Sequence, residues 1–172
     1  MTTNAMRGSI LVVDDTALDR ARLVAVVKKL KCKAIEVAHA DQVVDIAIEH
    51  QPIMVLMDVV MGPPNGFEVC RQLRENPKTH HIPVVLCSVK STEVDHEWAK
   101  RQGAMGYLGK PIDVEKTKDF LSRQWDRFQA ASENAKNRAL RKQEEKRLKT
   151  ESLKLTVEPI LVPPLDRVNN DQ

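Results

Sequence analysis

Three aspartates in two clusters are the residues of this chain best placed to do chemistry. Asp14 and Asp15 follow the apolar run Ile10 to Val13, and Asp58 follows the apolar run Ile53 to Met57. Apolar runs of this length predict strands that are buried on both faces, so each cluster is expected where a strand ends. If the two strands are parallel neighbours, the three carboxylates meet and repel one another unless a cation joins them. The oxygen ligands suit Mg²⁺.

The chain around these acids alternates between short apolar runs and helical patterns. We expect strands at residues 9–13, 34–38, 53–57, 84–88 and 104–108, and helices at 16–31, 41–49, 67–74, 94–102 and from near Asp113. The short connections predict right-handed crossovers and an α/β, doubly wound fold with a five-stranded parallel sheet. The flavodoxin-like strand order 2-1-3-4-5 would bring the first and third strands together, as the acid cluster requires.

Local signals are expected to define the ends and faces of the helices. Thr16 followed by Asp19 resembles a capping box, and Gly103 is a suitable residue to end the fourth helix. The loop after the third strand contains strong turn formers, namely Gly62, Pro63, Pro64, Asn65 and Gly66. The first helix is expected to turn five apolar residues toward the sheet, namely Leu18, Ala21, Val24, Ala25 and Val27.

Length and composition favour one soluble domain. The chain has 172 residues, of which 42% are hydrophobic, and this is enough for one domain with a real core. It contains no run long enough to span a membrane and no signal-peptide layout, so we expect a cytoplasmic protein. Cys32, Cys70 and Cys87 are odd in number and widely spaced, which argues against a disulfide framework or a zinc site.

The charge is distributed unevenly and predicts an extension beyond this domain. Residues 1–135 contain 18 basic and 18 acidic side chains, whereas residues 136–154 contain 8 basic and 3 acidic ones. We expect an N-terminal arm at 1–8, the domain at 9–128, a basic helical extension of the last helix at 129–154, and a flexible, proline-containing tail at 155–172. The basic helix is interpreted as a solvated face, with nucleic acid, acidic proteins and phospholipid as alternatives.

Taken together, the elements and their end residues resemble the receiver domain of bacterial two-component response regulators. Four segments carry the resemblance, in order and at the spacing typical of the family, and they are ILVVDD, VLMD, LCS and YLGKP. Each residue alone has an ordinary explanation, because an acid can cap a helix and a lysine can be solvated. Their coincidence at the ends of the expected strands favours the family.

The resemblance implies a phosphorylation site that depends on Mg²⁺. It implies that Asp58 is the phosphoacceptor, and that Asp14, Asp15, Asp58 and the carbonyl group of Val60 hold the metal ion. Many relatives have a polar residue in the place of Val60. Since a valine side chain cannot orient a hydrolytic water, we expect the phosphoryl group to be lost slowly.

The resemblance also implies how phosphorylation is assisted and detected. Lys110 would pair with the acids and, as a point charge, bind a phosphoryl oxygen. Ser88 would contact a further phosphoryl oxygen, and Tyr107 would rotate in response. The output surface would comprise the fourth helix, the fifth strand and the fifth helix.

Within the family, the stretch from Asn76 to Pro111 resembles stand-alone, PilH-like regulators of type IV pili, twitching or phototaxis. The implied partners are a histidine kinase or phosphotransfer domain and a downstream protein, and the chain is expected to be a switch rather than an enzyme. A nucleic-acid regulator is the alternative, but the extension is too short for a winged-helix domain. A haloacid-dehalogenase-like phosphatase is disfavoured, because its DxD signature is absent.

Overall fold

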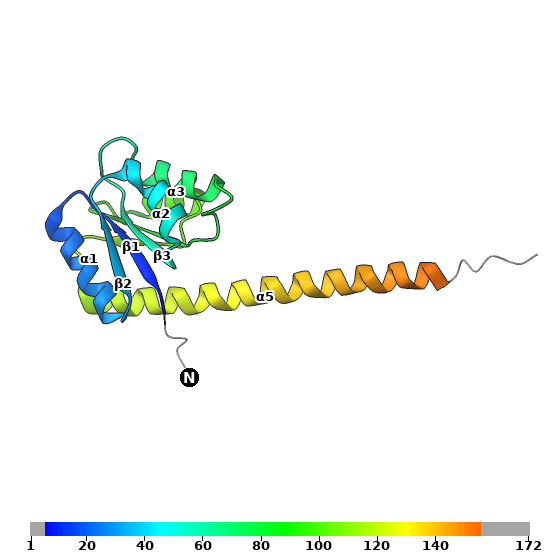
Figure 1. Ribbon diagram of the computed structural model, residues 1–172. Coiled ribbons are helices and arrows are strands. Elements are labelled where there is room, and N and C mark those ends of the chain that lie inside the picture. Colours follow the sequence, from blue (N-terminus) through cyan, green and yellow to red (C-terminus); the bar gives the residue numbers. More distant parts are fainter. Residues whose placement is uncertain (1–5, 156–172) are drawn as a thin grey trace, which may run out of the picture. The chain divides into compact units, whose positions relative to one another are not determined.

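The computed structural model describes residues 6–155, with side chains to residue 152. By its contacts the chain divides into two compact units, Met1–Phe128 and Gln129–Gln172. In the first unit, five parallel strands form a single sheet in the order β2-β1-β3-β4-β5. They are β1 (Ser9–Val13), β2 (Lys33–Val37), β3 (Met54–Asp58), β4 (Val84–Ser88) and β5 (Gly106–Gly109) (Figure 1). This order confirms the predicted doubly wound, flavodoxin-like sheet.

Helices cover both faces of the sheet. They are α1 (Ala17–Lys29), α2 (Val43–His50), which a short 3-10 turn at Ala40–Gln42 precedes, α3 (Gly66–Glu75), α4 (Glu93–Arg101) and α5 (Val114–Leu155). The buried side chains of α2, α3 and α4 pack in one apolar cluster, and those of α1 and the start of α5 pack in another. The sheet is therefore the middle layer of a three-layer sandwich.

The alternation of side chains along the strands explains these two clusters. In β1, Leu11 and Val13 belong to the cluster with α2 to α4, while Ile10 and Val12 belong to the cluster with α1 and α5. All four side chains are fully buried, as expected for a parallel strand that is covered on both faces. The sheet thereby forms a rigid platform whose carboxyl edge carries the acidic residues.

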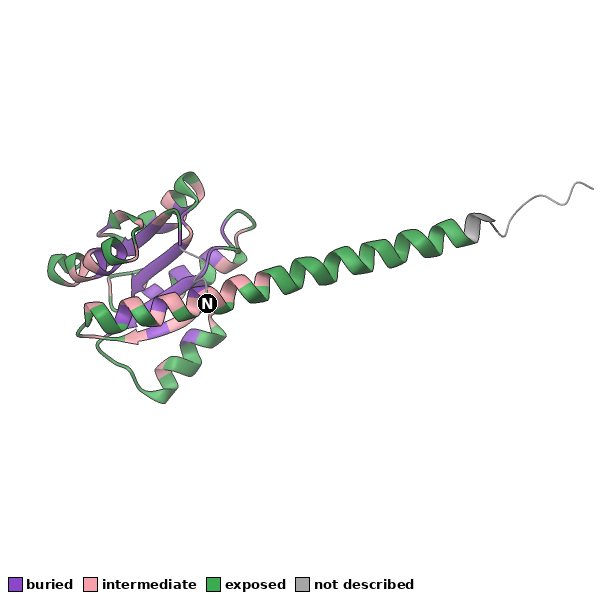
Figure 2. Cartoon of the chain, turned by 90° about the horizontal axis from the view of Figure 1, so that it is seen from below, coloured by how far each residue is buried: buried purple, intermediate pink, exposed green. Residues whose placement is uncertain are grey.

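The long C-terminal helix predicted from the composition is present. α5 continues to Leu155, and every residue from 133 to 152 is exposed (Figure 2). Helix-forming residues account for this length without burial. The predicted tail at 155–172 lies almost entirely outside the described residues, as does most of the predicted N-terminal arm. Within the described residues, no helix has both the length and the apolar character needed to cross a bilayer.

The predicted capping box at the start of α1 is wrong. The Thr16 side chain makes no cap hydrogen bond, and its hydroxyl group instead donates to Asp15 at 3.3 Å. Asp19 turns toward a lysine described below. Capping boxes form instead at Asn65 and Glu68 before α3 and at Thr92 and Asp95 before α4.

The predicted buried face of α1 is partly wrong. Leu18 is 62% exposed and Ala21 is also exposed, whereas Val24 and Val27 are buried as predicted and Leu23 and Val26 join them. The first turn of α1 follows directly from the carboxyl end of β1. Its side chains therefore lie at the edge of the sheet, where no strand covers them.

Three strands begin at other residues than predicted, and one of them is β3, which starts one residue later, at Met54. β2 starts one residue earlier, at Lys33, which pairs with Ser9. β5 starts two residues later than predicted, because the amide of Ala104 still donates to the carbonyl of Ala99 at the end of α4. Gly103 has a φ of +80°, which agrees with its predicted role at the end of that helix.

Candidate functional site

The carboxyl ends of β1 and β3 bring the predicted acids together. These strands are direct neighbours, with Val13 in register with Met57, so the residues that follow them lie at the same edge. One carboxylate oxygen from each of Asp14, Asp15 and Asp58 lies within 4.8 Å of the others. Asp14 and Asp58 are buried and Asp15 is exposed. The cluster is therefore open to solvent on the side of Asp15.

Lys110 reaches this cluster from the loop after β5. Its amide donates to the carbonyl of Ser88 at 2.8 Å, which fixes the loop to the end of β4. Its Nζ atom lies 2.8 Å from Asp14 Oδ2 and 2.9 Å from Asp58 Oδ1, and the side chain is 6% exposed. Lys110, which is 96 positions from Asp14 in the sequence, thus supplies a positive charge to the acidic cluster.

A further carboxylate, which sequence reasoning had assigned elsewhere, joins this group. Asp19 Oδ2 lies 3.1 Å from Lys110 Nζ. Asp19 stands on the first turn of α1, so it faces the same edge of the sheet as Asp14. The only available signal was its place in the first turn of the helix that follows Asp14 and Asp15. Arg20 also contacts the site, since its guanidinium donates to the carbonyl of Asp14 at 2.8 Å.

The electrostatics of the site follow from burial and from unequal numbers of charges. Burial raises the pKa of Asp58, the nearby Lys110 opposes this, and the charges of Asp14 and Asp15 add to it. Burial alone would lower the pKa of Lys110, but its contacts with the carboxylates of Asp14 and Asp58 outweigh burial and raise it. The lysine is therefore firmly protonated, and the carboxylates around it keep an excess of negative charge.

The residues present fit a divalent cation. Asp58 Oδ1 is buried and receives no hydrogen bond of good geometry from the described residues, although Lys110 Nζ lies near it. Asp14 Oδ1, by contrast, accepts a hydrogen bond from the amide of Thr16 at 2.9 Å. A ligand set of carboxylate oxygens that is partly open to water is what Mg²⁺ prefers. Val60, whose carbonyl is a predicted ligand, lies in the loop after β3 with its side chain 58% exposed.

A glycine allows the loop after β3 to fold close to Asp58. The amide of Gly66 donates to the carbonyl of Val59 at 3.1 Å. A Cβ atom at position 66 would lie 2.2 Å from the carbonyl oxygen of Asp58 and 2.8 Å from the Cα atom of Val59. Any side chain here would displace the backbone that carries Asp58, so the start of α3 helps to position the site.

Ser88 and Tyr107, which are predicted to respond to phosphorylation, lie beside the site. Ser88 is the last residue of β4, and Tyr107 lies in β5. Ser88 is buried, and its hydroxyl oxygen accepts a hydrogen bond from the amide of Lys90 at 3.2 Å. Tyr107 points inward with 7% exposure, and its hydroxyl group donates to the carbonyl of Lys90 at 2.5 Å. Both residues are therefore bonded to the same segment, the loop between β4 and α4.

His96 supports Tyr107 from α4. The two rings lie 4.8 Å apart, and His96 Nε2 is 3.0 Å from the hydroxyl oxygen of Ser91. Burial raises the pKa of Tyr107, so its hydroxyl group is kept as a donor. Sequence reasoning did not identify this contact, because a histidine on a helix carries no mark of what it packs against.

The five-stranded parallel sheet and the acidic cluster at its carboxyl edge are those of a response regulator receiver domain. Residues 10–122 match the model of the response regulator receiver domain. The chain therefore belongs to the receiver-domain family, whose members are signalling switches of two-component systems and bind Mg²⁺ in an acidic pocket.

Curated relatives agree with this assignment. The chain is 40% identical to protein PilH of Pseudomonas aeruginosa over 106 residues, which cover 62% of this chain and 88% of PilH. It is 28% identical to the polar-differentiation response regulator DivK of Brucella anthropi, over 63% of this chain and 89% of DivK. The response regulator PleD of Caulobacter vibrioides is 38% identical, but the match covers only 24% of PleD.

Solved structures share the fold. The chemotaxis response regulator CheY4 of Vibrio cholerae has a TM-score of 0.64 at 21% identity, over 69% of this chain and 99% of that one. The receiver domain of the Saccharomyces cerevisiae response regulator Ssk1, crystallised with the histidine phosphotransfer protein Ypd1, has a TM-score of 0.59 at 21% identity, over 64% of this chain and 83% of that one.

Proposed function

We propose that this chain is a phosphorelay response regulator in which Asp58 accepts a phosphoryl group from a histidine kinase or phosphotransfer domain. The reaction requires Mg²⁺, which is bound by Asp14, Asp15, Asp58 and the carbonyl of Val60. The observation that carries the proposal is the contact of Lys110 Nζ with both Asp14 and Asp58, beside the open carboxylate of Asp15. A single buried cation among several carboxylates leaves the site ready for further positive charge.

The transfer needs placement and charge neutralisation more than covalent assistance. A carboxylate oxygen of Asp58 attacks phosphorus, the phosphorus–nitrogen bond of the donor phosphohistidine breaks, and the freed imidazole takes a proton from water. When bound, Mg²⁺ supplies positive charge that neutralises phosphoryl oxygens. Lys110 holds a second phosphoryl oxygen, and the Ser88 hydroxyl group donates to a third.

The phosphoryl group is released by hydrolysis of the acyl phosphate. Water attacks phosphorus, the bond to Asp58 breaks, and inorganic phosphate leaves the carboxylate free. Val60, two residues after Asp58, has an exposed apolar side chain that cannot hydrogen-bond this water. We therefore propose that the chain keeps its phosphoryl group for longer than relatives with a polar residue at this position.

The signal reaches the surface through the loop between β4 and α4. To donate a hydrogen bond to the phosphoryl group, the Ser88 hydroxyl group turns away from the amide of Lys90, from which its oxygen now accepts a hydrogen bond, and the loop moves. The carbonyl of Lys90 then no longer holds the hydroxyl group of Tyr107, and the ring rotates. This couples phosphorylation to the surface of α4, β5 and α5.

The comparisons support a pathway and a class of donor. The similarity to PilH favours motility or taxis signalling, including type IV pilus systems. The complex of the Ssk1 receiver domain with Ypd1 illustrates the kind of phosphotransfer partner we propose for this chain. We also propose the division into an arm at 1–8, the receiver domain at 9–128, a basic helical extension at 129–154 and a tail at 155–172.

Intact mass after incubation with Mg²⁺ and acetyl phosphate tests the proposal. We expect one added phosphoryl group on the wild-type chain and none on Asp58→Ala. Asp45→Ala is the matched control, because Asp45 is an exposed acid on α2, and it should be modified like the wild type. A chain that gains no mass, or an Asp58→Ala variant that still gains it, contradicts the proposal.

A further inference from the structure

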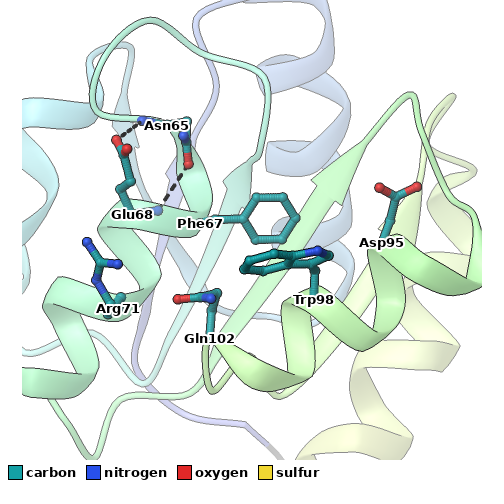
Figure 3. Close-up of a pocket in the computed structure, with 7 residues that line it drawn as sticks. All are labelled: Asn65, Phe67, Glu68, Arg71, Asp95, Trp98 and Gln102. Carbon is teal, nitrogen blue, oxygen red and sulfur yellow. Dashed lines mark hydrogen bonds between the residues drawn. The ribbon is translucent and has the colours of Figure 1, made fainter.

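The groove between α3 and α4 has an aromatic wall that the phosphorylation site does not use. Phe67 on α3 and Trp98 on α4 lie with ring centroids 6.5 Å apart and planes tilted by 50°. They line a hollow of about 300 Å³ together with Asn65, Glu68, Arg71, Asp95 and Gln102. Figure 3 shows the two rings facing each other between the helices, with Asp95 beyond Trp98.

From this groove we infer a docking surface for a segment of a partner protein that inserts a basic side chain, lysine or arginine, against Trp98. The inference rests on the proposed function, because a phosphorylation switch acts through a partner that binds its surface. It extends beyond the surface of α4, β5 and α5 proposed above, because the groove lies on the α3 side of α4. The argument uses exposure, shape and charge.

The exposure of Trp98 is not explained by packing. Trp98 is 51% exposed, whereas Trp125, the other tryptophan, is only 8% exposed and packs in the core. One turn before Trp98 on the same helix, Val94 is 66% exposed. Large apolar side chains that lie side by side on a helix surface, next to a hollow, are typical of interaction sites.

Trp98 separates two hollows rather than bordering one. On its other side, Glu93, Val94, Glu97 and Arg101 line a second hollow of about 430 Å³ with Trp98 itself. An extended or helical segment that crosses α4 can therefore contact the indole ring from both sides. This geometry places the tryptophan at the centre of the surface, where the residues that contribute most to binding are usually found.

Charge selects the chemistry of the partner. Around Trp98 the two hollows have four carboxylates and two guanidinium groups, from Glu68, Glu93, Asp95, Glu97, Arg71 and Arg101. Arg71 also lies 4.0 Å from Glu75, so its charge is shared with a further carboxylate. A cation placed over an indole ring with carboxylates nearby gains cation–π and Coulomb attraction, whereas an acidic side chain would be repelled.

The carboxylate of Asp95 is held in place before any partner binds. It accepts hydrogen bonds from the Thr92 amide at 2.9 Å and from the Thr92 hydroxyl group at 2.7 Å. These hydrogen bonds lower the pKa of Asp95, so the group stays ionised at neutral pH. Thr92 follows the loop that carries Lys90, so movement of that loop also reaches the groove. Docking and phosphorylation are therefore expected to influence each other reciprocally.

Selection from a library of random twelve-residue peptides against the full chain tests the inference. We expect enriched peptides to combine at least one lysine or arginine with a neighbouring apolar residue. Trp98→Ala should weaken their binding by about tenfold or more, as for a residue at the centre of an interface. Charge reversal in Glu93→Lys with Glu97→Lys should also weaken binding, and Leu140→Ala, which removes another exposed apolar residue, on α5, should not.

Two controls separate the possible failures. Circular dichroism should show that Trp98→Ala is folded, because the side chain is half exposed. The mass gain with acetyl phosphate should be the same in this variant and in the wild type, so a failed phosphorylation would count against the proposed function and not against the groove. No enriched peptide, enrichment without basic residues, or equal binding by Trp98→Ala would overturn the inference.

Discussion

Lys110 Nζ lies 3.1 Å from Asp19 Oδ2, and this ion pair joins the loop after β5 to the first turn of α1. The same ammonium group also contacts Asp14 and Asp58, so one buried cation is shared by three carboxylates from three elements. The lysine therefore has a structural role as well as the proposed role in phosphoryl transfer. The two roles can be separated, because stability can be measured without a phosphodonor.

Removal of Lys110 should strongly destabilise the chain in the absence of metal. Lys110→Ala leaves Asp14, Asp19 and Asp58 without their shared cation, and such losses cost about 3 to 5 kcal/mol. Urea unfolding without divalent ions measures this change. Lys118→Ala is the matched control, because Lys118 forms only exposed ion pairs, and it should unfold like the wild type. Equal stability of Lys110→Ala and wild type would show that the network does not hold these elements together.

Mg²⁺ should stabilise the folded chain, and Asp58→Asn should stabilise the metal-free chain. Burial raises the pKa of Asp58, so its ionised form is disfavoured on folding, and this cost grows as the pH rises through that raised pKa. At pH 7 the neutral asparagine removes the cost. For the wild type, Mg²⁺ at a hundredfold excess over its Kd should add about 2.7 kcal/mol.

Thermal unfolding at pH 7 with and without Mg²⁺ checks both effects. Asp15→Asn should reduce the response to Mg²⁺, and Asp45→Asn, an exposed acid away from the site, should keep it. A wild-type chain that unfolds at the same temperature with and without millimolar Mg²⁺ would contradict the assignment of the acidic cluster as a metal site.

The sequence was sufficient to predict the sheet and the meeting of Asp14, Asp15 and Asp58, because buried parallel strands appear as continuous apolar runs and their carboxyl ends share one edge. It was insufficient for Asp19, since an acid three residues after Thr16 fits a capping box as well as a distant lysine. The burial of Leu18 was overestimated for a related reason. Helical periodicity specifies which residues share a face but not how far the sheet extends beneath that face.

Contacts between segments that are distant in the sequence also could not be predicted from the sequence. The amide of Ala104 donates a hydrogen bond to α4, so β5 begins later than predicted. No local sequence signal indicates this hydrogen bond. Gly66 was recognised as a turn former, but its close approach to the backbone of Asp58 required the structure. The pairing of Phe67 with Trp98 likewise joins two helices whose relative position the sequence does not specify.

The hydroxyl group of Tyr107 should contribute to stability only before phosphorylation. In the unmodified chain Tyr107→Phe loses a partly buried hydrogen bond to the carbonyl of Lys90, at a cost of about 1 kcal/mol. With beryllofluoride, a phosphoryl mimic that was used to activate the DrrB receiver domain, the wild-type ring should already have rotated. Urea unfolding in both states measures the difference, and an equal loss in both would exclude the proposed rotation.

Val60→Asn should shorten the lifetime of the phosphoryl group. The amide side chain can orient a water at the entrance to the site, and positioning of this kind should accelerate hydrolysis by about tenfold. The decay of phosphorylated chain after removal of the donor, followed by intact mass, gives the rate. Val94→Asn, with a similarly exposed valine on α4, should decay like the wild type. Identical rates for Val60→Asn and wild type would refute the role given to Val60.

Borohydride trapping of the phosphorylated chain tests the central claim most directly. An acyl phosphate on an aspartate is reduced to homoserine, and peptide mapping by mass spectrometry then locates the modified residue. We predict homoserine at position 58 alone, formed only when Mg²⁺ and the phosphodonor are both present. Homoserine at Asp14 or Asp15, or a chain without homoserine under these conditions, would contradict the account.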